Sequence, residues 1–293
     1  RGIQGAPARL IEGFDVSGSL SVRGYPQALT WLLTLAGFKA TYTAGNGVIT
    51  DPDAVAIPVG VTRHVWTAPF GPTGSSPKTF QADASYKDQS VFFKLRGCAT
   101  QALTLDTPAN GGMQVKANGP ALYMARQSDP SLTPSYEALD VPPFERSHLT
   151  LPTWLASTSD FADFTIQFEN PVSAEHTGGS GSRWPDKMYK GDGPIVVTGS
   201  VPKELIGTAD YDALLAATGF AARAQWVSSK VIASGYPYKL FVEFANAQYI
   251  DGGPDPLSNR RRIGGSFGFK ATKGTGVTAS VIVTLCNNTA SYA

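Results

Sequence analysis

A strand-and-helix unit occurs twice in this chain of 293 residues, and the repetition constrains the fold more than any other feature. The first copy, FDVSGSLSVRG at residues 14–24, alternates strictly between apolar and polar positions. A period of two predicts a strand with one buried face. The second copy, IVVTGSVPKE at residues 195–204, carries the same Gly-Ser pair. Each copy leads into a helical pattern that ends in Gly-Phe, which predicts helices over 27–36 and 209–218.

The two copies align by eye with one inserted residue, VSGSLSVRGYPQALTWLLTLAGF lying over VTGSVPKELIGTADYDALLAATGF. The matched positions are Val16, Gly18, Ser19, Leu32, Leu33, Gly37 and Phe38 with Val197, Gly199, Ser200, Leu214, Leu215, Gly219 and Phe220. We expect the helices to play equivalent roles outside the sheet, each capped by its glycine. A ring of such units, each pairing its strand edge with the next, would leave no edge exposed.

The composition favours β structure and an assembled protein. Gly at 31 and Pro at 21 residues predict many turns. Charged residues make up 16%, below the usual share of about a quarter, which suits a surface that is partly covered by partner subunits. The net charge of +1 argues against a basic clamp for nucleic acid. No apolar run approaches the ~20 residues of a membrane helix.

The rest of the chain reads as strands joined by irregular segments. The predicted strands are SVFFKL (90–95), QALTLDT (101–107), MQVKANG (113–119), DFTIQFEN (163–170), YKLFVEFANAQYI (238–250) and a hairpin within 264–286 whose tip is KGTG. Residues 39–79 lack a clear period and are predicted to form a long loop or arm. Residues 127–160 are rich in Pro, Ser and Thr and are predicted to be a linker.

Catalytic or metal-binding patterns are weak. The histidines His64, His148 and His176 lack metal-ligand spacing and are interpreted as loop or surface residues. The sequence GGSFG at 264–268 matches a nucleophile elbow, but Ser266 lies in an alternating strand rather than in a strand-to-helix turn. We therefore predict neither an enzyme nor a bound cofactor or metal.

Two further groups leave alternatives open. Three strand carboxylates, Asp163, Glu169 and Glu243, would suit a glycosidase pair only if the fold brought two of them together. We prefer the interpretation that these carboxylates lie on a strand face that is exposed to solvent or faces the lumen of an assembly. Cys98 and Cys286 are interpreted as small buried thiols, although a disulfide stays possible from the sequence.

The stretch DVSGSLSVRGYPQALTWLLTLAGF resembles the opening motif of the tail tube (major tail) proteins of long-tailed bacteriophages. FADFTIQFENPVSA followed by GPIVVTGSV resembles the later part of the larger, two-repeat members. The resemblance implies a mainly β fold of two tandem tail-tube-like β-sandwich domains. Each would have a flanking short helix, with hairpins that join a β-barrel between subunits. It implies residues 1–126 as the first repeat with the arm inserted at about 39–79, 127–160 as the linker, and 161–293 as the second repeat.

The resemblance also implies a function and partners. Such a chain would be a structural virion protein of a siphophage tail, assembled in the host cytoplasm. Three copies would form a homotrimer ring, and rings would stack into a tube through which double-stranded DNA passes at ejection. Implied partners are other copies, the tape measure protein and DNA in the lumen, and the tail terminator and tail tip proteins, but no membrane. The family has no catalytic residues, so none are carried over.

Polar strand faces and apolar arm residues are the candidate functional sites. The predicted channel-lining residues are Ser17, Ser19, Thr104, Asp106, Thr165, Gln167, Thr278 and Ser280. The predicted contact residues of the arm are Val48, Ile49, Val55, Ile57 and Val59. Deleting the arm is expected to leave a soluble protein that forms no long tubes. The channel wall is expected to be neutral to negative, because a basic wall would retain DNA phosphates.

The alternative is a β-sandwich carbohydrate-binding or adhesive module of a surface or tail fibre. It would explain the β content and the five Trp, but not the repeated strand-helix unit. A β-rich hydrolase is a third interpretation. It would be recognised by turnover that is lost when Ser266 or a strand carboxylate is replaced.

Overall fold

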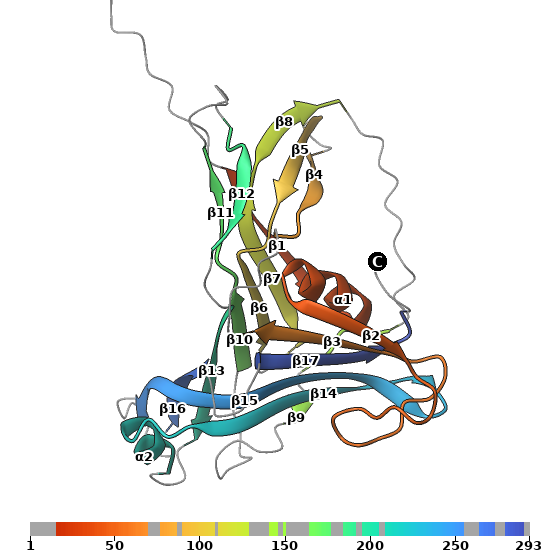
Figure 1. Ribbon diagram of the computed structural model, residues 1–293, viewed down its shortest axis with the longest axis vertical. Coiled ribbons are helices and arrows are strands. Elements are labelled where there is room, and N and C mark those ends of the chain that lie inside the picture. Colours follow the sequence, from red (N-terminus) through yellow and green to blue (C-terminus); the bar gives the residue numbers. More distant parts are fainter. Residues whose placement is uncertain are drawn as a thin grey trace, which may run out of the picture.

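The fold is mainly β, as the sequence predicts. The computed structural model (Figure 1) describes residues 16–69, 77–86, 90–108, 111–128, 141–145, 149–150, 164–176, 184–191, 195–204, 209–254, 264–272 and 279–289. Within these residues the helices are α1 (Pro26–Leu35) and α2 (Ala209–Leu215). Nearly all the remaining regular structure is strand.

Twelve strands form one large sheet in which every pair is antiparallel. The main order is β1 (Val16–Arg23), β7 (Gln114–Ala121), β6 (Ala102–Thr107), β10 (Phe164–Glu169), β13 (Val196–Glu204), β16 (Gly264–Ala271), β15 (Tyr236–Pro254), β17 (Ala279–Asn287), β3 (Thr62–Pro69) and β2 (Lys39–Ala44). Off this path, β14 (Phe220–Ala233) pairs with β15, and β9 (Leu149–Thr150) pairs with β14. Both halves of the sequence contribute strands to this sheet, and the division into two tandem domains stays a prediction.

The long strand β15 joins two parts of the sheet that cross one another in Figure 1. Residues 239–244 of β15 pair with β17, whereas residues 247–254 pair with β16. Part A comprises β1, β7, β6, β10, β13, β16 and residues 247–254 of β15. Part B comprises β14, residues 236–244 of β15, β17, β3 and β2.

The prediction of a hairpin within residues 264–286 is wrong. Strands β16 and β17 both run antiparallel to β15, so they follow one another along it instead of pairing together. Alternation correctly identified both strands, but alternation carries no information about which strand is the partner.

The core lies between part A, part B and helix α1. Aromatic side chains meet across it at ring-centroid distances of 5.9 Å for Phe164 and Trp226, and 5.1 Å for Phe38 and Phe168. Such tilted or edge-to-face contacts add to the stabilisation from buried apolar area. Because the inner faces of both sheet parts are apolar, one continuous cluster of buried residues connects them.

Helix α1 belongs to this core. It begins at Pro26, whose missing N–H costs nothing in the first turn. Leu29 and Leu33 are fully buried, and the helix packs on β17 and β3. The following Gly37 takes the left-handed conformation (φ 83°), as predicted for a helix cap.

Helix α2 has a different setting. It packs on β15 through the buried Ala213, while Leu215 remains 68% exposed. The left-handed residue after this helix is Ala217 (φ 47°), so the cap predicted at Gly219 is wrong. A side chain at Gly219 would instead collide with Asn246. The two helices therefore do not play equivalent roles within the chain.

Two smaller sheets lie together at one end of the molecule (Figure 1). One contains β4 (Phe80–Tyr86), β5 (Val91–Cys98) and β8 (Tyr123–Gln127), and the other β11 (Val172–Glu175) and β12 (Lys187–Lys190). Part of the predicted linker is core, because Phe144 is fully buried and accepts a backbone hydrogen bond from Met113 (2.6 Å).

Candidate assembly surfaces

One face of part A is polar from one end to the other. The strand register places residues side by side in rows across this face. One row contains Ser21, Lys116, Thr104, Gln167, Thr198, Lys270 and Gln248. The next contains Arg23, Gln114, Asp106, Thr165, Ser200, Gly268 and Asp251. Every residue in these rows is exposed or half-buried. We call this surface the polar face.

The opposite face of the same strands is apolar and buried. Leu103 and Leu105 on β6, and Phe164, Ile166 and Phe168 on β10, are at most 2% exposed. Successive side chains of a strand point to opposite sides. The alternation that predicted these strands therefore assigns their polar residues to one common surface.

Six of the eight predicted channel-lining residues lie on the polar face. They are Ser17, Ser19, Thr104, Asp106, Thr165 and Gln167. The prediction for Ser280 is wrong, because Ser280 lies in part B, is 2% exposed and donates a hydrogen bond to the carbonyl of Ala68 (2.9 Å). Thr278 lies outside the described residues.

Charges on the polar face are balanced. Among its described side chains, three are basic and three acidic, namely Arg23, Lys116 and Lys270 with Asp106, Glu169 and Asp251. Lys116 Nζ lies 3.7 Å from Asp106, which also accepts a hydrogen bond from Thr165 (3.2 Å). Gln167 donates to Glu169 (2.7 Å). The surface is hydrophilic without a strong field of either sign.

Among the described residues, the strand at each end of part A pairs on one side only, so part A has two open edges. At one end, β1 pairs with β7 alone, and its residues 17–21 are exposed whichever face they occupy. At the other end, β14 reaches only Ala247, so residues 248–254 of β15 pair with β16 alone. Open edges offer unpaired N–H and C=O groups to another chain.

The segment predicted as a long arm is more ordered than expected. Residues 39–44 and 62–69 form the β2–β3 hairpin, and β3 places the fully buried Trp66 in the core. The expectation that the whole arm can be deleted from a folded protein is therefore wrong. Residues 45–61, which connect the two strands and which we call the arm loop, lie outside the sheet, and residues 70–76 of the predicted arm lie outside the described residues.

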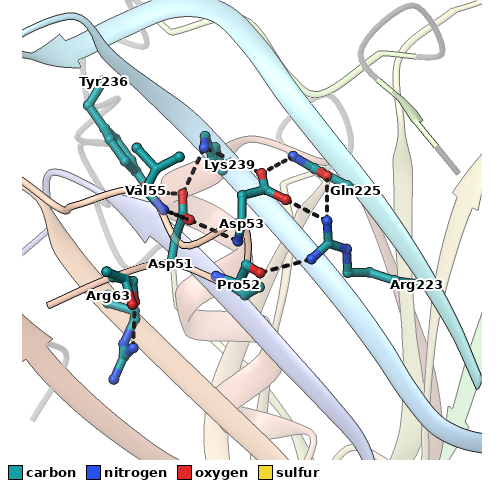
Figure 2. A network of polar contacts seen from close by, with 10 residues as sticks. Asp51, Pro52, Asp53, Val55, Arg63, Arg223, Gln225, Tyr236 and Lys239 are labelled. Atoms are coloured by element: carbon teal, nitrogen blue, oxygen red, sulfur yellow. Dashed lines mark hydrogen bonds and ion pairs between the residues drawn. The ribbon is translucent and has the colours of Figure 1, made fainter. Parts of the chain in front are cut away.

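Two carboxylates anchor the arm loop to part B (Figure 2). Asp51 is 4% exposed and accepts hydrogen bonds from Lys239 Nζ and the Tyr236 hydroxyl, both at 2.7 Å. Its other oxygen accepts from the backbone N–H groups of Asp53 (2.9 Å) and Val55 (3.0 Å). Burial tends to raise the pKa of Asp51, but the donors, led by Lys239, outweigh it and hold this pKa below 3.8.

Asp53 extends the same network to β14. It forms an ion pair with Arg223 and accepts a hydrogen bond from Gln225 (2.6 Å), while Lys239 lies 3.5 Å away (Figure 2). Arg223 also donates to the carbonyl of Pro52 (3.1 Å). The loop comes from the first half of the chain and its anchors from the second, so this network connects the two halves.

The five predicted contact residues of the arm divide into two groups. Ile57 is fully buried within its own chain beside Val61, Tyr236 and Cys286, and Ile49 is half-buried. Ile57 is therefore not available to a partner. The remaining three are exposed, namely Val48 (80%), Val59 (76%) and Val55 (44%).

His64 corrects another expectation. It is fully buried, stacks on Trp66 and is hydrogen-bonded through Nε2 to the side chain of Asn287 (2.8 Å). Asn287 in turn donates to Thr30 of α1 (2.9 Å), so this cluster joins β3, β17 and the helix. Burial lowers the pKa of His64 below 6.5. The polarity of His64 concealed this role in the sequence.

The structure offers no support for the catalytic alternatives within the residues it describes. Ser266 lies in strand β16 rather than at an elbow. Glu169 lies on the polar face of part A, whereas Glu243 lies on β15 in part B, opposite Arg223 of β14 in the strand register. No group of His, Cys, Asp and Glu in the described chain has the geometry of a metal site. Cys98 and Cys286 are free and buried. Asp163 and His148 lie outside the described residues.

A family model described as phage tail tube protein matches residues 1–271. The chain belongs to the phage tail tube protein family. The resemblance found in the Gly-Ser strands is thereby confirmed, and the chain is a structural component of a virion tail. A comparison with curated proteins gave no match. None of the described helices of this tail tube protein has the length and apolar character needed to cross a membrane.

Proposed function

We propose that three copies of this chain close into a ring, that rings stack into a tail tube, and that the polar face of part A lines the channel through which DNA is ejected. The observation that carries this proposal is a polar face that is continuous across seven strands and ends in an open edge on both sides. A surface of this kind can be extended from copy to copy into a wall.

The chemistry of the polar face suits passage rather than binding. Hydroxyl and amide side chains keep a wall hydrated, and the three basic groups are matched by three acidic ones. A basic wall would bind phosphates and release counterions, which would hold DNA in place. The tape measure protein before ejection and DNA during it would be transient, non-specific occupants. Tail terminator and tail tip proteins would close the two ends of the tube.

Three copies follow from the internal repeat. A head-to-tail contact closes into a ring only if the rotation per unit divides the circle. Two strand-helix units in each chain let three chains supply six units. The ring would have threefold symmetry and an approximate sixfold arrangement of strands.

The arm loop is proposed as a contact between subunits or stacked rings. Its three exposed valines are held outward by a loop that Asp51 and Asp53 fix to part B. A pre-organised loop loses little conformational entropy on binding. An exposed apolar group of this kind is typical of a surface that a partner covers.

Electron microscopy of the purified protein, with native mass measurement of its rings, tests the proposal. We expect tubes built from rings of three chains. A double variant, Val48→Asp with Val59→Asp, should remain folded but form few long tubes, whereas the control Asn288→Asp, at another exposed position, should assemble normally. Monodisperse monomers of the unmodified protein would contradict the proposal and favour the carbohydrate-binding or adhesive alternative. Rings of six whole chains would contradict the trimer.

A further inference from the structure

The two glycines of the repeated Gly-Ser motif meet different surroundings. Gly199 on β13 lies directly opposite Phe269 on β16. A side chain at Gly199 would collide with the Phe269 ring, which fills the space above the glycine and is itself fully buried. In the second unit, therefore, an aromatic side chain uses the room that the glycine leaves.

Gly18 on β1 has no such cover. It lies opposite another glycine, Gly119, and no heavy atom of the described residues lies within 4 Å of the position that its Cβ would take. Gly18 is not among the glycines with positive φ, so the backbone does not require glycine there. The neighbouring Leu20 points to the same side and is 41% exposed.

A shallow depression lies at this part of strand β1. It is lined by Ser17, Gly18, Ser19, Gln101, Asn118 and Gly119. We call it the Gly18 notch. It lies on the open strand β1, at one end of part A.

We infer that the Gly18 notch and Leu20 form the seam between adjacent chains of a ring, and that they receive the Ile250 end of β15 from a second copy. This inference rests on the proposed ring and names its contact. The filled site at Gly199 shows within the same chain how an apolar side chain occupies such a space.

The opposite end of part A carries the matching surface. Ile250 lies at an irregularity of β15, between Tyr249 and Asp251, and is 54% exposed. Leu20 and Ile250 are the large apolar side chains exposed on the two end strands of part A, among the residues described. Both therefore lie where one copy of part A would meet the next.

Helix α2 enlarges the apolar surface at the Ile250 end. It packs on β15, and Gln248 of that strand donates a hydrogen bond to the carbonyl of Ala217 just beyond the helix (2.9 Å). Tyr211 and Leu215 on α2 are 42% and 68% exposed. A contact between unlike ends of the molecule repeats from copy to copy and closes into a ring at the proper rotation.

Cysteine cross-linking tests which ends meet. Leu20→Cys and Ile250→Cys are prepared as separate single variants, and both native cysteines are buried. Under oxidation, a mixture of the two variants should yield a covalent dimer containing one chain of each, while neither variant should dimerise alone. Dimers of Leu20→Cys with itself would overturn the inference, because they require like ends to meet.

A second variant tests the notch itself. Gly18→Trp fills open space and should unfold at the same temperature as the unmodified protein, yet it should form about tenfold fewer tubes, because a filled notch excludes its partner. Asn288→Trp, at the exposed control position used above, controls for added aromatic surface. Normal tubes from Gly18→Trp, together with the absence of a mixed cross-link, would overturn this inference but not the proposed function. Failure of the unmodified protein to form tubes would instead overturn the proposed function, and the seam with it.

Discussion

The two strand-helix units share a sequence pattern but have opposite surroundings. In the first unit, strand β1 is open along one edge while helix α1 is buried in the core. In the second, strand β13 is paired on both edges while helix α2 is largely exposed. Each unit therefore leaves a different element uncovered.

This difference shows how one pattern can serve two purposes. Local sequence specifies a strand followed by a helix in both units, but the neighbours of each unit decide which face is buried. The uncovered strand and the uncovered helix lie at different ends of part A, since α2 packs on β15. A chain with two unlike uncovered ends is suited to head-to-tail assembly.

Substitutions at Asp51 should have the largest effect, because Asp51 connects the two halves of the chain. Asp51→Asn leaves the buried Lys239 without its closest carboxylate, and breaking a buried ion pair costs about 3–5 kcal/mol of unfolding free energy. Asp53→Asn is the matched control, with a smaller loss expected because Asp53 is more exposed. Denaturant unfolding measures both. Equal losses would contradict the view that Asp51 is the main anchor.

The contrast between the helices can be tested by trimming one leucine in each. Leu33→Ala in α1 should lower the unfolding free energy by about 2–5 kcal/mol, because it leaves a cavity in the core. Leu215→Ala in α2 should change it by less than about 0.5 kcal/mol, as at other exposed positions. Thermal unfolding compares the two. A large loss at Leu215 would show that α2 is also part of the core.

The contrast between the glycines predicts a smaller difference. Gly199→Val should destabilise the monomer by about 1–3 kcal/mol, because the added side chain forces Phe269 out of place. Gly18→Val should be nearly neutral, since a valine there meets open space and favours a strand. Chemical denaturation of both variants at low protein concentration measures the effect without assembly. Similar losses at the two sites would contradict the difference in their surroundings.

Acidification should produce the smallest effect, through His64 in the first unit. Its pKa in the folded protein is lowered from 6.5, so the unfolded chain binds a proton more readily. The stability that neutral, buried His64 contributes to the folded state is complete above pH 6.5 and declines as the pH falls below that value. His64→Gln should flatten the dependence of melting temperature on pH in this range. An unchanged profile in His64→Gln would contradict the assignment.

The sequence was sufficient to predict the elements that bury one face and expose the other. Strands β6 and β10 and helix α1 were predicted because each buries one side on its own period, and the same alternation brought Thr104 and Gln167 onto one face. It was insufficient wherever a distant partner decides the outcome. Nothing near Asp51 indicates that Lys239, far along the chain, will meet it.

Two further differences have the same origin. Strands β16 and β17 resemble the arms of a hairpin until β15 is known to lie beside both. Gly18 and Gly199 occupy matching positions in the repeat, yet only one of them faces an aromatic ring. Ser280 alternates like a lining residue but lies in part B, where it is buried and donates a hydrogen bond to the carbonyl of Ala68 on the neighbouring strand β3. Periodicity specifies the strand, whereas its neighbours determine which surface is exposed.

A reconstruction of the assembled tube by electron cryomicroscopy tests the central claim most directly. We expect threefold rings with Thr104, Asp106, Thr165 and Gln167 facing the channel, and with Leu20 of each chain at the seam beside Ile250 of the next. A tube whose channel is lined by part B, or whose polar face points outward to solvent, would contradict the account.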